Sequence, residues 1–123
     1  MEFDSLSNRV IGCAIEVHRN LGPGLMESTY ERCLAYEFEL AGIAFEAQRT
    51  LPVQYKGNHL DCGYRIDLLV QNSLIVELKA VEKVLRLHHA QLLTYMKLSA
   101  IRTGLLINFN VPILRDGIER FVL

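Results

Sequence analysis

The segment from Ile66 to Ala80 reads IDLLVQNSLIVELKA. Two short apolar runs flank polar residues 71–73, a pattern typical of two strands joined by a tight turn. Since neither run alternates regularly with polar residues, we expect this hairpin to lie at the centre of a sheet that is covered on both faces. A turn centred on Asn72 then places Asp67 directly opposite Glu77.

These facing carboxylates predict a chemical site. Cross-strand side chains lie about 4.5–5.5 Å apart at Cβ, so like charges repel there, and in an apolar hairpin they need a cation or a shared proton. Lys79 lies two residues beyond Glu77 and shares its face, but one ammonium neutralises only one carboxylate. A hard divalent cation such as Mg²⁺ would neutralise the remaining negative charge. An Asp, a Glu and a Lys around one metal ion can activate a water molecule that attacks a phosphoryl group. We therefore expect phosphodiester hydrolysis; a buried structural salt-bridge cluster is the alternative.

The next predicted helix adds two polar side chains. Gln91 and Tyr95 are spaced i, i+4, so they share a helix face that can look down on the strand ends. Gln91 could orient a water molecule or Lys79, and Tyr95 could donate to a phosphate oxygen. A helix packing face with polar tips is the alternative.

The rest of the chain indicates an α/β fold. Apolar residues at steps of three and four predict helices over 5–20, 26–41 and 85–99. Short apolar runs between turn residues predict strands over 43–49, 51–55, 60–70, 74–80, 103–109 and 118–122. No repeat or linker interrupts them, so we expect one domain over residues 1–123, with helices flanking a mixed sheet.

Composition limits the classes of partner. Of the 123 residues, 50% are hydrophobic and 22% are charged, which suits a folded soluble protein. The formal net charge of −1 argues against binding nucleic acid or a membrane surface through bulk charge. A near-neutral charge is still compatible with a site where a metal ion contacts the phosphate. Such a protein would bind its substrate weakly or would depend on a protein partner that binds the substrate.

Cysteines and termini indicate a cytoplasmic protein. Cys13, Cys33 and Cys62 form no C-x-x-C pair, so we expect buried free thiols. The acidic start is unlike a secretory signal, and no run of about 18 apolar residues is present for a membrane span. His18 and His59 are expected on the surface.

Three motifs in order resemble those of a known nuclease superfamily. Asp67, then Glu77-Leu78-Lys79, then the Q-x-x-x-Y of residues 91–95 resemble the signature of the PD-(D/E)XK nucleases, nearest to their RecB-like branch. Residues 24–30 match the G-x-x-E-x-x-Y signature of a family of small prokaryotic proteins in that superfamily. The resemblance covers about residues 9–122. One departure is Ile66, where the superfamily name has Pro.

The resemblance implies a restriction-endonuclease-like core and a set of roles. Asp67, Glu77 and the backbone carbonyl of Leu78 would bind Mg²⁺ or Mn²⁺, and Lys79 would position or activate the attacking water. A glutamate of the first core helix often joins such a site. Glu27 and Glu31 are i, i+4 neighbours that both qualify, with Glu27 favoured because it belongs to the named motif.

Further expectations concern function and assembly. The first is a Mg²⁺-dependent nuclease, acting on DNA rather than RNA, with Gln91, Tyr95 and Glu27 assisting. The second is a non-catalytic binding or assembly module that acts with a partner protein. A homodimer through the exposed last strand fits both. Tyr30 either hydrogen-bonds a catalytic carboxylate or packs in the core. His88 and His89 are expected at the start of the third helix, where they are exposed or belong to the helix end; a phosphate or metal contact by one of them is the alternative.

Overall fold

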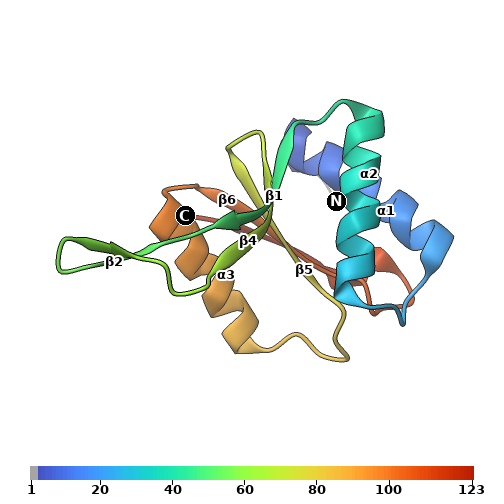
Figure 1. Ribbon diagram of the computed structural model, residues 1–123. Helices are drawn as coiled ribbons and strands as arrows, with labels where there is room; N and C mark the ends of the chain where they lie inside the picture. The colour runs from blue at the N-terminus through green and yellow to red at the C-terminus, as the bar shows by residue number, and fades with distance from the viewer. Residues whose placement is uncertain (1–2) are drawn as a thin grey trace.

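The computed structural model describes residues 3–123, and the chain forms three layers (Figure 1). The helices are α1 (Ser5–Leu21), α2 (Glu27–Ala41), α3 (Arg86–Ser99) and the short 3-10 helix η1 (Leu114–Gly117). The strands are β1 (Phe45–Thr50), β2 (Val53–Tyr55), β3 (Asn58–Leu60), β4 (Arg65–Val70), β5 (Leu74–Lys79), β6 (Thr103–Asn108) and β7 (Ile118–Val122). α1 and α2 cover one face of the main sheet and α3 covers the other. The expected α/β arrangement is confirmed.

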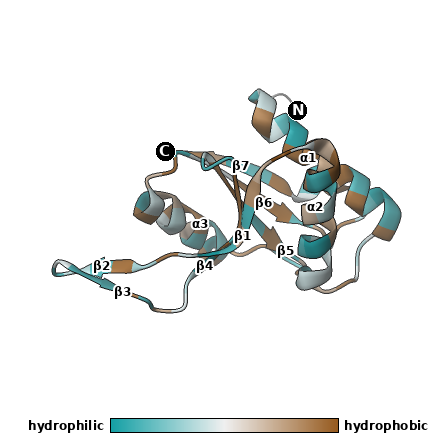
Figure 2. Cartoon of the chain, turned by 45° about the horizontal axis from the view of Figure 1, so that its top comes forward, coloured by the Kyte–Doolittle hydropathy of each residue, from teal (hydrophilic) through white to brown (hydrophobic). Residues whose placement is uncertain are grey.

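The main sheet is mixed, in the order β1-β4-β5-β6-β7. β5 and β6 run parallel, and α3 is the crossover that joins them. The three central strands are hydrophobic along nearly their whole length, whereas the outer helices alternate hydrophobic and hydrophilic residues (Figure 2). The sheet is therefore buried on both faces, as the sequence predicted for the hairpin of β4 and β5.

The register of that hairpin agrees with the prediction. Leu68 pairs with Val76, and the pairing continues to the turn. Gln71 and Asn72 both have positive φ, 49° and 52°, and the Ser73 N–H donates to the Val70 carbonyl. This is the geometry of a type I′ turn. The turn aligns the two strands so that Asp67 and Glu77 come to the same end of the sheet.

Two apolar cores hold the layers together. Beneath α1 and α2, Tyr30 stacks on Phe109 with ring centroids 4.4 Å apart, and both residues are fully buried. Beneath α3, Leu92 and Met96 pack so closely over Gly104 of β6 that a Cβ there would lie 2.9 Å from the Met96 sulfur. A side chain at Gly104 would displace the ends of the Leu92 and Met96 side chains, so this glycine allows α3 to pack closely on the sheet.

Helix ends follow from local chemistry. The Asp4 carboxylate accepts the Ser7 N–H (3.0 Å) and caps α1, as a short acidic side chain does at this position. Gly42, in the left-handed conformation (φ 69°), ends α2 and returns its N–H to the Glu39 and Phe38 carbonyls, the usual stop for a helix. Asp4 thus fixes the start of α1, and Gly42 fixes the point where α2 ends and the chain turns towards β1.

The strand predicted over residues 60–70 is wrong in one respect. It is divided into β3 and β4, because the Asp61 carboxylate accepts the Gly63 N–H (2.9 Å) and Gly63 takes φ 83°. Together these break the extended chain. β2 and β3 therefore form a separate two-stranded sheet, here called the arm, which projects from the body beside α3 (Figures 1 and 2).

Two smaller expectations are also wrong. Cys62 is exposed because it lies in the loop between β3 and β4, and Cys13 and Cys33 are only partly buried. His18 is buried rather than on the surface, and its Nε2 lies 2.8 Å from the Val111 carbonyl oxygen, which satisfies the ring. No helix among residues 3–123 has both the length and the hydropathy needed to cross a bilayer.

Candidate active site

The hairpin of β4 and β5 opens where its two carboxylates lie. Backbone pairing of the two strands extends from the turn as far as Leu68 and Val76. One residue further along, the Asp67 N–H donates to Glu77 Oε1 (3.0 Å), and the Leu78 N–H donates to Asp67 Oδ2 (2.9 Å). Each carboxylate thus accepts a backbone N–H of the opposite strand. The predicted juxtaposition of Asp67 and Glu77 is present, and these two bonds hold it rigidly.

Glu77 is in an unfavourable place for a negative charge. The residue is 7% exposed, and burial together with neighbouring Asp67 raises its pKa to about 9. Both effects favour the neutral form of a carboxyl group. The Asp67 N–H and Lys79 act in the opposite direction but do not outweigh burial. At neutral pH, the pair therefore holds a proton unless another cation arrives.

α2 brings two more carboxylates to the same place. The pKa of Glu27 is raised, mainly by burial and further by the charge of Asp67, although Lys79 acts in the opposite direction. Burial also raises the pKa of Glu31, with a further increase from Asp67 and Glu27. Both glutamates thus lie within electrostatic range of Asp67, so the structure brings Glu27 and Glu31 to the site together.

Gln48 of β1 belongs to this cluster, although the sequence did not point to it. Its Nε2 donates to Glu31 Oε1 (2.7 Å) and, at longer range, to Asp67 Oδ1 (3.4 Å). Gln48 has φ 54° and is skipped in the pairing of β1 with β4. Such a φ is unfavourable for a residue with a side chain. This local break in the strand directs Gln48 towards the carboxylates, and no periodicity in the sequence signals it.

α3 supplies Tyr95 from the other face of the sheet. Burial raises the pKa of Tyr95, and so do Glu77, Asp67 and Tyr64, which places its hydroxyl near the carboxylate pair. Gln91, one turn earlier, is exposed. His88 Nδ1 accepts the Leu85 N–H (3.0 Å), so this histidine caps the start of α3.

Tyr30 has the second of its two predicted roles. Its ring is fully buried, and its hydroxyl donates to the Gly22 carbonyl (2.6 Å) and accepts the Leu25 N–H (3.2 Å). Gly24, inside the loop that this hydroxyl closes, has φ 98°. The G-x-x-E-x-x-Y motif is thus a device that holds the loop before α2 and so fixes the position of Glu27.

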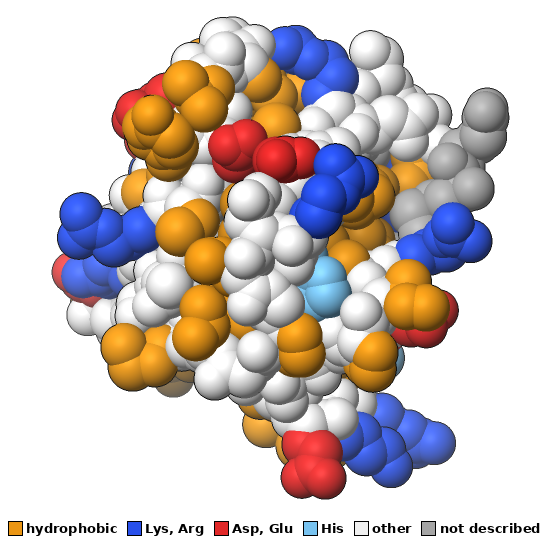
Figure 3. All heavy atoms as spheres, turned by 90° about the vertical axis from the view of Figure 1, so that its right-hand side faces the viewer, with side chains coloured by type: hydrophobic (Ala, Val, Ile, Leu, Met, Phe, Trp, Pro, Cys, Tyr) orange, Lys and Arg blue, Asp and Glu red, His pale blue; other side chains and the backbone are white. Residues whose placement is uncertain are grey.

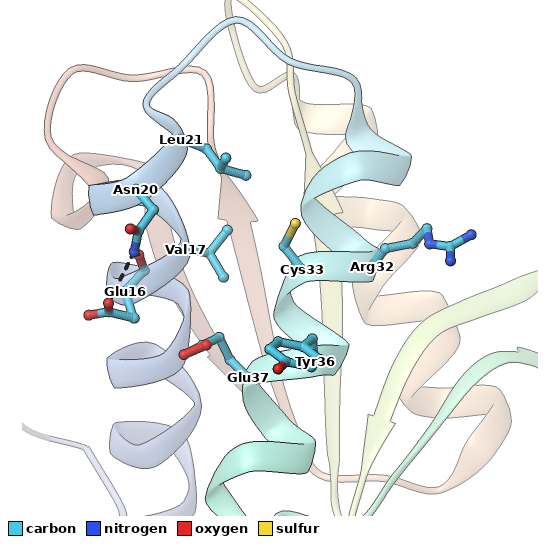
Figure 4. Close-up of a pocket in the computed structure, with 8 residues that line it drawn as sticks. All are labelled: Glu16, Val17, Asn20, Leu21, Arg32, Cys33, Tyr36 and Glu37. Atoms are coloured by element: carbon cyan, nitrogen blue, oxygen red, sulfur yellow. Dashed lines mark hydrogen bonds between the residues drawn. The ribbon is translucent and has the colours of Figure 1, made fainter.

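A sizeable apolar hollow lies elsewhere. A groove of about 280 Å³ separates α1 from α2, and Figure 4 shows Cys33, Val17 and Leu21 facing one another across it. Glu16 at its edge is hydrogen-bonded to Asn20. None of its eight lining residues belongs to the carboxylate cluster, so the groove and the candidate active site are separate.

The donor types at the cluster suit a divalent cation. Carboxylate and carbonyl oxygens are the ligands that Mg²⁺ prefers, usually one or two carboxylates with retained water. Asp67, Glu77 and the Leu78 carbonyl would hold such an ion, with Glu27 and Glu31 nearby. Among residues 3–123, no three His, Cys, Asp or Glu side chains are gathered closely enough to form a ready-made metal centre.

Comparison with known proteins gives a family for this arrangement. A family model described as the PD-(D/E)XK nuclease superfamily matches residues 4–121, and the mixed five-stranded sheet between helices agrees with its restriction-endonuclease-like fold. No curated protein and no solved structure matched the chain. The G-x-x-E-x-x-Y subfamily stays a prediction. The chain belongs to the PD-(D/E)XK nuclease superfamily.

Proposed function

We propose that this protein hydrolyses phosphodiester bonds of nucleic acid, DNA rather than RNA, with Mg²⁺ or Mn²⁺. The observation that carries the proposal is the pairing of buried Glu77 with half-buried Asp67, beside Lys79, at the open end of a central hairpin. A buried carboxylate whose pKa is raised to about 9 keeps its charge only with a cation close by. The family supplies the precedent for nuclease chemistry.

The residues divide the work by their chemistry. Asp67, Glu77 and the Leu78 carbonyl hold the cation, which would offset the negative charge of the phosphate when bound. Lys79 positions the attacking water and stabilises charge on the phosphoryl oxygens. Glu27 and Glu31 approach from α2 and orient water on the side away from α3.

Two residues of α3 face the substrate. The raised pKa of Tyr95 keeps its hydroxyl protonated at neutral pH, so it can donate to a phosphate oxygen. Gln91 is exposed one turn away and can orient water or the Lys79 ammonium. Both therefore act by positioning and by hydrogen bonding.

Hydrolysis assays test the proposal. Purified protein is incubated with Mg²⁺ or Mn²⁺ and labelled single-stranded, duplex and structured DNA and RNA. We expect metal-dependent cleavage, with Lys79→Ala slower by about 10²–10⁴-fold because charge stabilisation and water positioning are both lost. Arg32→Ala, an exposed cation on the outside of α2, is the control and should cleave normally. Inactivity of the wild-type protein on every substrate would contradict the proposal.

A non-catalytic binding or assembly module is the second candidate. It is favoured by the internal hydrogen bonds of the pair, since each carboxylate already accepts a backbone N–H. Titration calorimetry separates the two candidates. A nuclease should bind Mn²⁺ and lose it in Glu77→Ala, whereas a purely structural cluster should give no heat in either protein.

Assembly is a separate proposal. β7 is an edge strand of the sheet, and Val122 in it is 59% exposed. A second copy or a protein partner could therefore pair with its free edge. Light scattering should then give the mass of a dimer. A monomeric mass over the accessible concentration range would contradict self-pairing.

A further inference from the structure

Charge is unevenly distributed along the chain. Residues 1–46, which include α1 and α2, contain eight Asp and Glu but three Lys and Arg, whereas residues 47–115 contain nine Lys and Arg but four Asp and Glu. On the side that α1 and α2 dominate, cationic and anionic groups are scattered among neutral and hydrophobic ones (Figure 3). The net charge of −1 therefore conceals a cationic half. A sum over the chain does not show this separation.

The arm is the most exposed part of that cationic half. Lys56 and Gly57 both have positive φ, 49° and 81°, so a tight type I′ turn forms its tip. Every residue from Gln54 to Leu60 is exposed, and none of them is acidic. A two-stranded hairpin gains little stability by itself, and the face that carries Val53, Tyr55 and Leu60 is largely exposed, so this projecting hairpin is better suited to contact a partner than to support the core.

The tip carries a stacking surface and a cation. Tyr55 is 57% exposed, and Lys56 Nζ lies 5.4 Å from the centre of its ring. The cation and the exposed ring thus lie side by side at the tip. An aromatic face with an adjacent cation matches a base and its phosphate.

The base of the arm continues this surface towards the carboxylates. Tyr64, in the loop between β3 and β4, is 44% exposed, and its ring centroid lies 6.0 Å from that of Tyr95. Tyr95 in turn lies close enough to Glu77 and Asp67 for both to raise its pKa. Tyrosines thus mark the tip of the arm, its base and the candidate active site.

We infer that the arm and the loop at its base bind an unpaired strand of nucleic acid and lead it to the carboxylate cluster. Exposed tyrosines stack on bases only where those bases are unstacked, as in single strands and frayed ends, while bases of a duplex are covered by their neighbours. Lys56 would contact a phosphate. The inference rests on the proposed function, since it names the form of the substrate.

Binding in a chelating buffer tests the inference without hydrolysis. The probe is a fluorescein-labelled oligothymidylate of about 16 nucleotides, the upper site size for one single-strand binding module. We expect Tyr55→Ala to weaken binding about 5- to 150-fold, the loss of one base stack. Lys56→Ala should reduce the slope of log affinity against log salt by about 0.7, the loss of one phosphate contact. Tyr36→Ala is the matched control, because Tyr36 is 60% exposed but lies on α2.

A second measurement uses the wild-type protein alone. Cys62 is exposed in the loop that carries Tyr64, while Cys13 and Cys33 are partly buried on α1 and α2. Bound oligothymidylate should slow alkylation of Cys62 by iodoacetamide and leave the other two cysteines unchanged, as read by peptide mass spectrometry.

The outcomes separate this inference from the proposed function. Normal binding by both Tyr55→Ala and Lys56→Ala, no binding by the wild-type protein, or an equal loss on duplex DNA would overturn the single-strand arm. Metal-dependent hydrolysis with unaltered arm variants would overturn the arm and keep the nuclease. Loss of binding in the arm variants of a protein that never hydrolyses would overturn the nuclease and keep the arm.

Discussion

Tyr30 offers a sharp test of how the motif of residues 24–30 works. Its hydroxyl makes two partly buried hydrogen bonds, to the Gly22 carbonyl at 2.6 Å and from the Leu25 N–H at 3.2 Å. Tyr30→Phe removes the hydroxyl and keeps the ring on Phe109. Because a buried polar group left without its partner costs about 1–3 kcal/mol, we expect the free energy of unfolding to fall by about 1–3 kcal/mol.

Urea denaturation followed by circular dichroism measures that loss, with Tyr36→Phe as the control on an exposed tyrosine of the same helix. At a temperature where the wild-type protein and Tyr30→Phe are both fully folded, their rates of hydrolysis should differ little, since the hydroxyl contacts the loop rather than the carboxylates. An unchanged free energy of unfolding would refute the assigned bonds. A fully stable variant that has lost its activity would instead place the hydroxyl in the reaction.

Three further predictions concern the carboxylate cluster. The first concerns the stability of the metal-free protein, measured in a buffer that contains a chelator. Because the pKa of Glu77 is raised from 4.5 to about 9, the folded chain binds one more proton than the unfolded chain between these pH values. The free energy of unfolding contributed by this group should therefore fall with rising pH by about 1.4 kcal/mol per unit in the middle of that window. Glu77→Gln keeps the oxygen that accepts the Asp67 N–H and should remove that slope in urea denaturation; equal slopes in the two proteins would contradict the shift. Mn²⁺ affinity by calorimetry should rise with pH over the same range, because the ligand must lose its proton, and an affinity independent of pH would argue against Glu77 as a ligand. Gln48→Gly should raise the free energy of unfolding by about 1 kcal/mol by relieving the positive φ. The same variant should slow hydrolysis, because Glu31 and Asp67 lose their shared donor; normal hydrolysis would show that Gln48 has no positioning role.

The central hairpin was predictable because two local signals agree. Continuous apolar runs define buried strands, and the polar turn around Asn72 sets their register, so the position of Asp67 opposite Glu77 follows from counting. The side of α3 on which Tyr95 lies was predictable for the same reason, since helical spacing needs only neighbouring residues. Features set by short-range periodicity were therefore visible in the chain.

Features that depend on distant contacts were not visible. The break at Gly63 that frees the arm comes from one side-chain hydrogen bond of Asp61, and an apolar run gives no sign of it. The position of Gln48 depends on α2 and β4 together, and the burial of His18 depends on Val111, which lies far along the chain. The uneven charge of residues 1–46 and 47–115 gains a location only from the fold, which puts Lys56 at the turn of the exposed arm.

Hydrolysis by the Asp67→Asn protein tests the central claim most directly. The substitution keeps the side-chain shape and an oxygen for the Leu78 N–H, but removes the charge that would hold a cation. Single-turnover cleavage of a labelled oligonucleotide with Mn²⁺ should be clear in the wild-type protein and at least about a hundredfold slower in the variant. Equal rates in the two proteins, or wild-type cleavage that persists in chelator, would contradict a metal-dependent nuclease built on Asp67 and Glu77.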